Sequence, residues 1–417
     1  MQLITFYILV LLLVLGERVK AQLQSALPAQ DSKQASSSRE NITLELYEKP
    51  DWKTIDIDFL SSYYSQDGNH AAVTGGIGTE HLTDFTQKVI VRLPMTPQTK
   101  INFDAGYDYY SSASTDNIDN IRASASLHDM RVHGNMGLTH DLNQQSSLGI
   151  RLGASSEYDY TSLNGGLNYA WLSSDQNTSI GIGAQAFFDT WELYYPRELR
   201  RRGRLVPTDK RKSLNASFSI SHVINRKMQV SLQMEATYMD GLLSTPFHRV
   251  YFEDQNLPRV ESLPQSRLKI PVGLRLNTYH AEWLISRLYY RYYRDDWGIQ
   301  GHTASLELPV KFNRFMSLYP SYRYHTQSGA DYFKPYKSHL TSDVFYTSDY
   351  DLAELDSHSL GLGFSFSPVD GIMKTKVPFT AHGSILLESI DVKYAYYSRS
   401  TDLKAHIVSL GLSFKIR

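Results

Sequence analysis

The feature that most constrains the fold is a strict two-residue alternation along the last segment of the chain, residues 404–416. The apolar positions are Val408, Leu410, Leu412, Phe414 and Ile416, and the positions between them are Ser409, Gly411, Ser413 and Lys415. Successive side chains of a β-strand point to opposite faces, so the apolar set and the small or polar set separate onto two sides. A strand of this kind is typical of a transmembrane β-barrel.

The same alternation recurs upstream and predicts sixteen strands, most of them close to the 9–11 residues that a tilted membrane strand requires. We expect these strands near 52–65, 82–93, 100–111, 123–139, 147–158, 162–172, 179–189, 213–223, 229–239, 267–276, 284–294, 302–311, 315–325, 358–367, 384–397 and 404–416. The first, second and fifteenth segments alternate irregularly, so fourteen or eighteen strands are the alternatives.

The connections between these segments alternate in length. The predicted periplasmic turns are short: 94–99, 140–146, 173–178, 224–228, 277–283, 312–314 and 367–375. Several predicted outside loops are long: 66–81, 190–212, 240–266 and 326–357. Short turns at one end and long loops at the other are the pattern of outer-membrane barrels. The sequence therefore predicts an all-β fold over residues 51–417, a transmembrane antiparallel up-and-down β-barrel of about 16 strands.

The N-terminus is similar to an export signal. Leu3 to Leu15 form an apolar run that only Thr5 interrupts, and Ala21 precedes the expected cleavage site. No Lys or Arg precedes the run, which is atypical, and a single membrane anchor is the alternative reading. The run is shorter than the roughly 18 apolar residues of a spanning helix. We expect a signal peptide at 1–21, a periplasmic linker at 22–50, and a location in the outer membrane of a Gram-negative bacterium.

The composition agrees with this class of protein. The chain has 29 Tyr, and Tyr is enriched where barrels meet the membrane interfaces. It has no Cys, which excludes disulfides, thiolate metal sites and c-type haem attachment. The net charge of −1 gives no support for nucleic acid as a partner.

Charged residues occupy the face that the strand map turns inward. The acidic members lie on the first three strands: Asp56, Asp58, Asp84, Asp104 and Asp108. The basic members lie on the tenth to thirteenth strands: Lys269, Arg275, Arg287, Arg291, Lys311 and Arg323. Sixteen strands enclose enough space for a water-filled channel, and charged walls bias which ions pass. In the alternative reading, the charges pair across a packed lumen or with an inward-folded loop.

The predicted outside loop 190–212 is strongly basic. Its arginines include Arg197, Arg200, Arg201, Arg202 and Arg204. Such a cluster suits the phosphates of lipopolysaccharide or another anionic partner. The alternative is a solvated loop that pairs with acidic neighbours.

Calcium is the one cofactor for which the sequence offers candidates. Asp56 and Asp58 share a strand face about 7 Å apart, within reach of one ion. Asp67, Asn69 and Glu80 lie in a glycine-rich loop that we expect to fold tightly into the barrel mouth. No other cofactor is predicted.

The sequence gives little support for catalysis. The 14 His are scattered, and none forms a His-Glu-x-x-His motif. His302 with Ser305, and His358 with Ser359, are the pairs that a barrel hydrolase would use, but such neighbours are common by chance. We therefore predict that the protein is not an enzyme.

Two segments carry a resemblance to a known family. Gln66–Glu80 and Asp104–Ile118 resemble the signature loops of a domain-of-unknown-function family of bacterial outer-membrane β-barrel proteins. The resemblance implies an outer-membrane barrel, and the genetic neighbours of this family imply a link to envelope redox traffic. The two signature loops coincide with the first two predicted outside loops. Asp67, Glu80, Asp116 and Asp119 are therefore the first choice for a functional cluster.

These observations lead to one principal expectation and two alternatives. The principal expectation is a non-enzymatic outer-membrane barrel, either a channel or an envelope scaffold. The alternatives are a barrel enzyme acting on a lipid or surface substrate, and a soluble periplasmic β-rich binding protein. The expected partners are outer-membrane lipid, lipopolysaccharide, the barrel assembly machinery and small solutes, with no nucleic acid.

Overall fold

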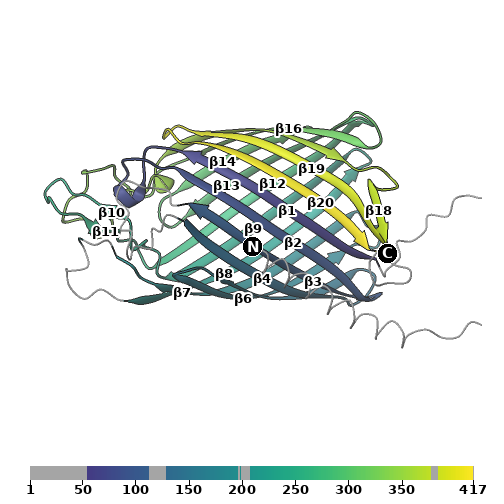
Figure 1. Ribbon diagram of the computed structural model, residues 1–417, viewed down its shortest axis with the longest axis horizontal. Coiled ribbons are helices and arrows are strands. Elements are labelled where there is room, and N and C mark those ends of the chain that lie inside the picture. The colour runs from purple at the N-terminus through teal and green to yellow at the C-terminus, as the bar shows by residue number, and fades with distance from the viewer. Residues whose placement is uncertain (1–53, 112–127, 196–197, 199–206, 377–383, 417) are drawn as a thin grey trace, which may run out of the picture. The chain divides into compact units, whose positions relative to one another are not determined.

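The computed structural model describes residues 54–111, 128–195, 198, 207–376 and 384–416. The expected signal peptide and linker, 1–50, lie outside these residues. Within them, eighteen strand segments form one antiparallel sheet that closes on itself, and two short strands pair separately (Figure 1). No helix of the described part is both long and apolar enough to cross a membrane.

The described residues form sixteen wall strands from eighteen hydrogen-bonded segments, because β15 continues β14 and the short β18 pairs only with the start of β19. The first nine are β1 (Ile55–Asp67), β2 (Leu82–Thr96), β3 (Thr99–Ser111), β4 (His128–Asp141), β5 (Ser146–Ser156), β6 (Tyr160–Leu172), β7 (Thr178–Glu192), β8 (Thr208–Asn225) and β9 (Met228–Gly241). The others are β12 (Ser266–Ala281), β13 (Leu284–Asp295), β14 (Gln300–Glu307) with β15 (Val310–Lys311), β16 (Met316–Gln327), β17 (Leu355–Phe366), β19 (Ser384–Arg399) with β18 (Met373–Lys376), and β20 (Lys404–Ile416).

The first and last strands close the barrel. β1 pairs with β2 on one side and with β20 on the other, in an unbroken register from Ile55 opposite Ile416 to Asp67 opposite Lys404. Closure leaves no unpaired strand edge, which is the condition for a sheet to cross a lipid bilayer. The predicted fold class and strand number are both confirmed.

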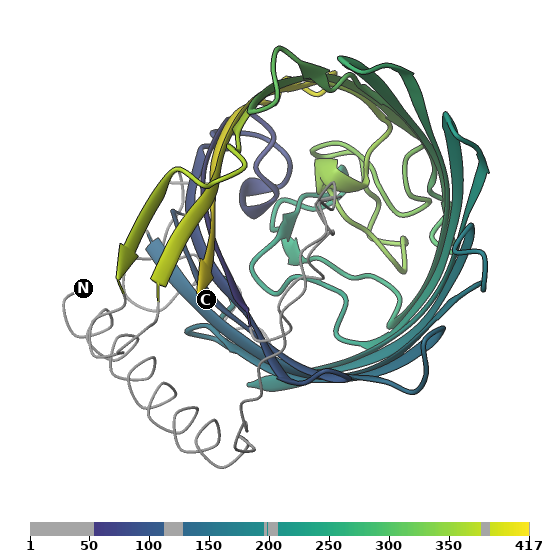
Figure 2. The same ribbon diagram turned by 90° about the vertical axis from the view of Figure 1, so that its right-hand side faces the viewer.

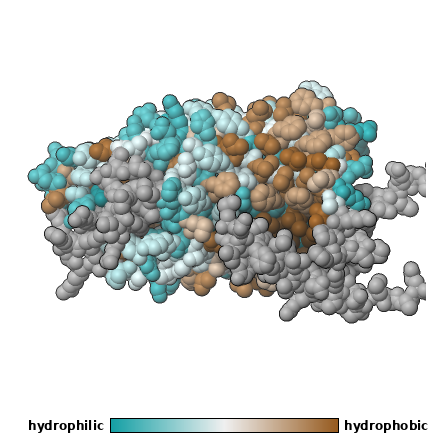
Figure 3. All heavy atoms as spheres, in the orientation of Figure 1, coloured by the Kyte–Doolittle hydropathy of each residue, from teal (hydrophilic) through white to brown (hydrophobic). Residues whose placement is uncertain are grey.

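The alternation of the last strand separates its two faces as expected. Leu412 and Phe414 lie opposite Phe59 and Ile57 on the outward face, while Ser413 lies opposite Asp58 on the lumen face. Many large apolar side chains on the outward faces are exposed, including Leu152 at 65% and Leu163 at 64%. In Figure 3 the apolar residues gather in a band toward the end of the barrel where the C-terminus lies, and the loop end is hydrophilic.

Several strands are longer than the sequence pattern predicts. β8 begins at Thr208, whereas the sequence pattern predicts a strand at 213–223 and places residues 208–212 in the preceding loop. Its added residues pair with β7, from Lys212 opposite Phe188 to Thr208 opposite Glu192. A strand of this length exceeds the 9–11 residues that the bilayer requires, so the barrel wall continues beyond the membrane on the loop side.

The two ends of the barrel differ as the loop lengths predict. The short turns and the C-terminus lie at one end, and the long loops with β10 (Arg249–Val250) and β11 (Arg259–Val260) lie at the other (Figure 1). Segments of these loops fall inside the ring of strands when the barrel is viewed along its length (Figure 2). The long loops therefore occupy the barrel mouth.

A capped barrel mouth and a charged lumen as the candidate functional site

Three outside loops pack against one another and form what we call the cap: residues 68–81 with η1 (Ala72–Thr74), residues 242–265 with β10 and β11, and residues 328–354 with η2 (Tyr350–Leu352). Arg249 donates a hydrogen bond of 2.6 Å to the backbone carbonyl of Val73. The ring of His70 stacks on that of Tyr350, with centroids 3.8 Å apart. The cap is therefore one packed body and not three independent loops.

The cap has its own apolar core. Val250 and Phe252 are fully buried and cluster with Tyr346. Ser262 and Tyr346 exchange two backbone hydrogen bonds, of 3.1 and 2.7 Å, between the second and third loops. The guanidinium of Arg259 lies 4.8 Å from the ring centroid of Phe252. Burial of large side chains is the main stabilising contribution in such a cluster.

Glycines permit the close approach of the first loop. Gly75 and Gly76 have φ values of 84° and 85°, in the region that side chains disfavour. A Cβ at Gly75 would lie 2.6 Å from the ring of Tyr251, and one at Gly76 would lie 2.7 Å from the carbonyl oxygen of Ser348. The glycine-rich loop is thus shaped to pack against the other two loops.

The cap is tied to the barrel wall at the mouth. Arg399, at the end of β19, forms a 2.7 Å ion pair with Asp351 of η2. The side chain of Gln327 donates to the carbonyl oxygens of Asp351 and Ala353. The side-chain amide of Gln66 donates to Glu80 at 3.0 Å. These contacts hold the cap against β1, β16 and β19.

The predicted calcium ligands of the first loop differ in their exposure. Asp67 and Asn69 are exposed, whereas Glu80 is partly buried beside Gln66. Burial raises the pKa of Glu80 to about 7, and the charge of Asp351 adds to this effect. Glu80 therefore titrates near neutral pH inside the cap.

The other predicted calcium ligands have different surroundings. Asp58 accepts hydrogen bonds from Arg92 at 2.6 Å and from Ser413 at 2.8 Å, so both of its oxygens are engaged. Asp56 lies two residues away on the same lumen face. Asp116 and Asp119 lie outside the described residues, as do Arg197, Arg200, Arg201, Arg202 and Arg204 of the basic loop.

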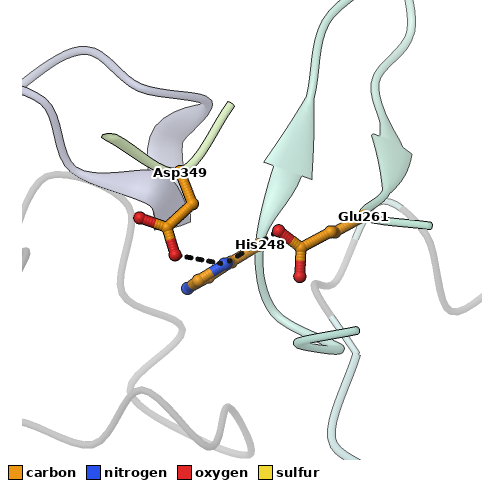
Figure 4. Close-up of side chains that lie close together, drawn as sticks. All are labelled: His248, Glu261 and Asp349. Atoms are coloured by element: carbon orange, nitrogen blue, oxygen red, sulfur yellow. Dashed lines mark ion pairs between the residues drawn. The ribbon is translucent and has the colours of Figure 1, made fainter. Parts of the chain in front are cut away.

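A cluster of three potential metal ligands lies within the cap (Figure 4). It consists of His248, Glu261 and Asp349. The Nδ1 atom of His248 lies 3.5 Å from Glu261 Oε1 and 4.0 Å from Asp349 Oδ2. Figure 4 shows the imidazole lying between the two carboxylates. The first two residues come from the second loop and the third comes from the third loop.

The charges in this cluster depend on one another. Burial alone would lower the pKa of His248, but Glu261 raises it above its ordinary value. Burial also opposes ionisation of Glu261, yet the charge of His248 and hydrogen bonds from Thr245 and Thr347 hold the pKa of Glu261 below its usual range. Burial raises the pKa of Asp349. Without an ion, a protonated histidine would be needed to balance the buried Glu261 and the partly exposed Asp349.

A second group of carboxylates lies near the outer ends of β4 and β6: Asp129, Glu157 and Asp159. Glu157 accepts a hydrogen bond from Tyr110 at 3.0 Å and lies 3.7 Å from Arg131. This group contains oxygen ligands alone, and a basic side chain already offsets part of its charge.

The lumen charges fall into two sectors. The acidic sector lies on β1–β3, where Lys88 pairs with Asp104 at 3.4 Å and Thr86 donates to Asp108 at 2.9 Å. Asp84 is a further member, and its side chain accepts a hydrogen bond from Thr86. The acidic wall is therefore partly neutralised by lysine and arginine from the same strands.

The basic sector spans β12–β16 and is less neutralised. Arg287 forms a 2.8 Å ion pair with Glu307, and the guanidinium of Arg275 lies 5.3 Å from the ring centroid of Tyr289. Within the described part of the chain, Arg291 and Arg323 have no ion-pair partner. The remaining basic residues of this sector are Lys269 and Lys311. Some lumen charges thus pair between neighbouring strands, and others have no ion-pair partner among the described residues.

A cavity of about 430 Å³ lies in the lumen wall between β3 and β8. Its lining residues include Asp108, Arg131, His133, Asn135, Arg151, Ser155, Ser162, Asn164, Asp189, Arg211 and Ser213. Arg211 pairs with the buried Asp189 at 2.8 Å, whereas Arg151 has no ion-pair partner among the described residues. The cavity is a polar, charged recess of the size of a small-molecule site.

The histidine–serine pairs suggested for catalysis do not meet. His302 points outward and its Nδ1 lies 2.7 Å from the hydroxyl of Tyr290, whereas Ser305 lies on the lumen face opposite Arg323. His358 likewise contacts the hydroxyl of Tyr322 outside, at 2.8 Å, while Ser359 faces the lumen. Opposite faces of one sheet cannot form a nucleophile–base pair.

These outward histidines belong to a repeated arrangement that the sequence analysis missed. A third example is His406, whose Nδ1 lies 2.8 Å from the hydroxyl of Tyr394. In each case the histidine lies near the loop end of its strand and contacts a tyrosine of the preceding strand. Aromatic belts of this kind mark membrane interfaces. The signal was available as three Tyr-x-Tyr segments, each followed by a strand whose third or fourth residue is histidine.

A closed antiparallel barrel with an apolar outer band and a charged lumen defines the class as an outer-membrane-type β-barrel. The chain matches the model of the family described as "Protein of unknown function (DUF3570)" over residues 95–379, and it belongs to this family. The match includes the segment Asp104–Ile118, whereas Gln66–Glu80 lies before it. No curated protein matches the sequence.

Solved structures with a similar fold include three bacterial barrels. One is a bacterial polysaccharide outer membrane secretin, with 10% identity, a TM-score of 0.46, and coverage of 88% of this chain and 99% of that one. Another is the siderophore receptor PirA from Pseudomonas aeruginosa, with 9% identity, a TM-score of 0.40, and coverage of 86% and 80%. OccK1 (OpdK) from Pseudomonas aeruginosa has 7% identity, a TM-score of 0.40, and coverage of 87% and 98%. Likenesses at these scores transfer no function to this chain.

Proposed function

We propose that the protein is a non-enzymatic channel of the outer membrane that admits small, charged, polar solutes past the cap. The apolar outward band, the long loops at one end and the export-like N-terminus support the location. The observation that carries the channel function is the polar cavity between β3 and β8, which lies in the wall of a barrel wide enough for an aqueous path.

The cap and the cavity are formed by different parts of the barrel. The cap loops follow β1, β9 and β16, whereas the cavity is lined by β3–β8. A solute that entered beside the cap would meet Arg151 and the Arg211–Asp189 pair in the cavity wall. It would also meet, elsewhere on the lumen wall, Arg291 and Arg323, which have no ion-pair partner among the described residues. Fixed charges of both signs suit a small zwitterionic or anionic solute.

An envelope scaffold is the second candidate that the same barrel supports. The packed cap presents a defined surface at the loop end, which a partner is able to recognise. The link to envelope redox traffic remains a prediction of the family resemblance. An ion current through the reconstituted protein separates a channel from a closed scaffold.

The experiment is single-channel conductance of the purified protein in planar bilayers, with cavity-filling variants. Ser155→Trp and Ser213→Trp would fill the cavity from the lumen face. Leu163→Trp places the same side chain on the outward face, where Leu163 is 64% exposed, and is the matched control. We expect steady conductance in the wild type and in the control, and a clear reduction in both cavity variants.

Two results would contradict the proposal. One is the absence of conductance from wild-type protein that shows heat-modifiable barrel migration on a gel. The other is conductance that Ser155→Trp and Ser213→Trp leave unchanged, since current would then not pass along β3–β8.

A further inference from the structure

We propose that the cap holds a divalent transition-metal ion between His248, Glu261 and Asp349, and that this ion joins the second and third cap loops. The inference concerns metal binding by the cap and does not depend on whether the barrel conducts. It follows from the donor atoms, their spacing and the hydrogen bonds that orient them.

The spacing of the donor atoms fits a single small ion. His248 Nδ1, one oxygen of Glu261 and one of Asp349 all lie within 4.8 Å of one another. Ligands at about 2.1 Å from a metal lie roughly 3.0–3.4 Å apart in octahedral or tetrahedral geometry. The observed 3.5 Å and 4.0 Å separations from Nδ1 therefore require inward shifts of well under 1 Å.

The histidine donor atom is unsatisfied without an ion. Nδ1 of His248 is buried and makes no hydrogen bond among the described residues, although both carboxylates lie within ion-pair distance of it. It is also the atom that points at both carboxylates. A buried polar atom without a partner is costly, and a metal bond to Nδ1 would remove that cost.

The two carboxylates are already oriented by other groups. Thr347, which is fully buried, donates its hydroxyl hydrogen to Glu261 Oε1 and accepts the backbone N–H of Asp349 at 3.0 Å. The backbone N–H of Thr245 donates to Glu261 Oε2 at 2.7 Å. The backbone N–H of Asp351 donates to Asp349 Oδ1 at 2.9 Å, so Oδ2 is left to face His248. Such outer contacts around metal ligands fix their direction and raise affinity.

The chemistry of the donors selects the class of metal. One imidazole nitrogen and two carboxylate oxygens suit Zn²⁺, Mn²⁺, Fe²⁺ or Co²⁺. Calcium prefers oxygen ligands throughout and a higher coordination number. Two carboxylates also balance the charge of a divalent ion, which allows His248 to remain neutral as a ligand.

The ion would connect segments that are far apart in the sequence. His248 and Glu261 belong to the loop between β9 and β12, and Asp349 belongs to the loop between β16 and β17. A ligand that binds only the assembled form stabilises that form in proportion to the logarithm of its concentration. Metal binding should therefore protect the cap against proteolysis.

The test uses EDTA-treated full-length protein in detergent, titrated with Co²⁺ and followed by visible absorption. We expect one Co²⁺ per chain, displaced by Zn²⁺ and not by Ca²⁺. His248→Gln and Asp349→Asn should each weaken binding by about 100-fold or more. His302→Gln removes a histidine on the outward face of the barrel and should bind Co²⁺ as the wild type does.

A second pair of variants separates positioning from folding. Thr347→Val removes the hydroxyl that orients both carboxylates and should weaken binding about 10- to 100-fold, whereas Thr347→Ser should retain affinity. Limited proteolysis of each metal-free variant shows whether its cap is folded like that of the metal-free wild type. If the cap of His248→Gln is not folded in this way, the affinities of Asp349→Asn, Thr347→Val and Thr347→Ser test the proposed site instead.

The proposal is overturned if the wild type shows no saturable Co²⁺ binding. It is equally overturned if folded His248→Gln and Asp349→Asn bind with unchanged affinity, or if Thr347→Val and Thr347→Ser behave alike at wild-type affinity.

Discussion

Arg249 donates to the backbone carbonyl of Val73 at 2.6 Å, and it also forms a 2.5 Å ion pair with Glu198. One buried guanidinium thus joins the first cap loop to the second and reaches a residue of the loop between β7 and β8. Arginine suits this position because its planar group offers several donors in fixed directions. The contact explains how loops with little secondary structure form one body.

Arg249→Ala should loosen the cap without unfolding the barrel. It removes the donor for the carbonyl of Val73, which costs about 1–3 kcal/mol, and the cation beside the partly exposed Glu198, which adds little. Hydrogen exchange and limited proteolysis should show faster opening confined to the cap. Arg249→Lys, which keeps the charge, should have a smaller effect. Protection of the cap that is unchanged in Arg249→Ala would show that this contact does not hold the loops together.

The cap should open more readily as the pH rises through neutrality. Burial and the charge of Asp351 raise the pKa of Glu80 to about 7 from an ordinary 4.5, Asp349 acts in the same direction, and Arg399 opposes them. Tyr64 also interacts with Glu80. Because the folded-state pKa lies above the ordinary value, ionisation of Glu80 opposes the closed cap. The closed cap is most stable below pH 4.5 and loses stability up to about pH 7.

Conductance measured between pH 5 and pH 8 tests this relationship. The wild type should conduct more at pH 8 than at pH 5, and Glu80→Gln should remove most of that difference because its side chain cannot ionise. If the conductance of Glu80→Gln retains the full pH dependence of the wild type, ionisation of Glu80 does not control the cap.

Ion selectivity should follow the unpaired arginines of the basic sector. Arg291→Glu with Arg323→Glu reverses two charges that lack ion-pair partners within the described residues, so the reversal potential in a salt gradient should shift toward cations. Arg287→Gln is the comparison, since Glu307 already offsets the charge of Arg287 at 2.8 Å. An unchanged reversal potential in the double variant would place the conducting path elsewhere.

The outward face should tolerate charge far less than the lumen face does. Ile150 is 46% exposed on the outward face of β5, and Ser155 lies on the lumen face of the same strand. Ile150→Arg should destabilise the barrel in lipid by about 2–4 kcal/mol, whereas Ser155→Arg should cost little. Urea unfolding in lipid vesicles measures both. Equal losses would argue against the assignment of the two faces.

The sequence was most informative where one physical requirement repeats. Each wall strand must turn apolar residues to lipid and polar residues to the lumen, so the period of two located all sixteen strands of the described part. The two-residue period did not predict the strand ends that extend beyond the membrane. In β8, Lys210, Arg211 and Lys212 continue the ladder without an apolar face, because no lipid contacts that part of the wall.

The cap cluster could not be predicted in the same way. His248, Glu261 and Asp349 come from two loops without periodicity, and their proximity depends on the fold of the cap around Phe252 and Tyr346. The glycine-rich loop was correctly expected to fold tightly at the mouth. Its acidic residues were predicted as calcium ligands, whereas its glycines allow the close packing that forms the cap.

The most direct test of the account is to lock the cap and measure the current. Ser262 and Tyr346 form a hydrogen-bonded antiparallel pair between two cap loops, where Cα atoms are about 5.5 Å apart and a disulfide is sterically allowed. The chain has no Cys, so Ser262→Cys with Tyr346→Cys introduces a single crosslink. We predict that the oxidised double variant is held at low conductance and that reduction raises its current. Equal currents before and after reduction would contradict a cap that controls passage through this barrel.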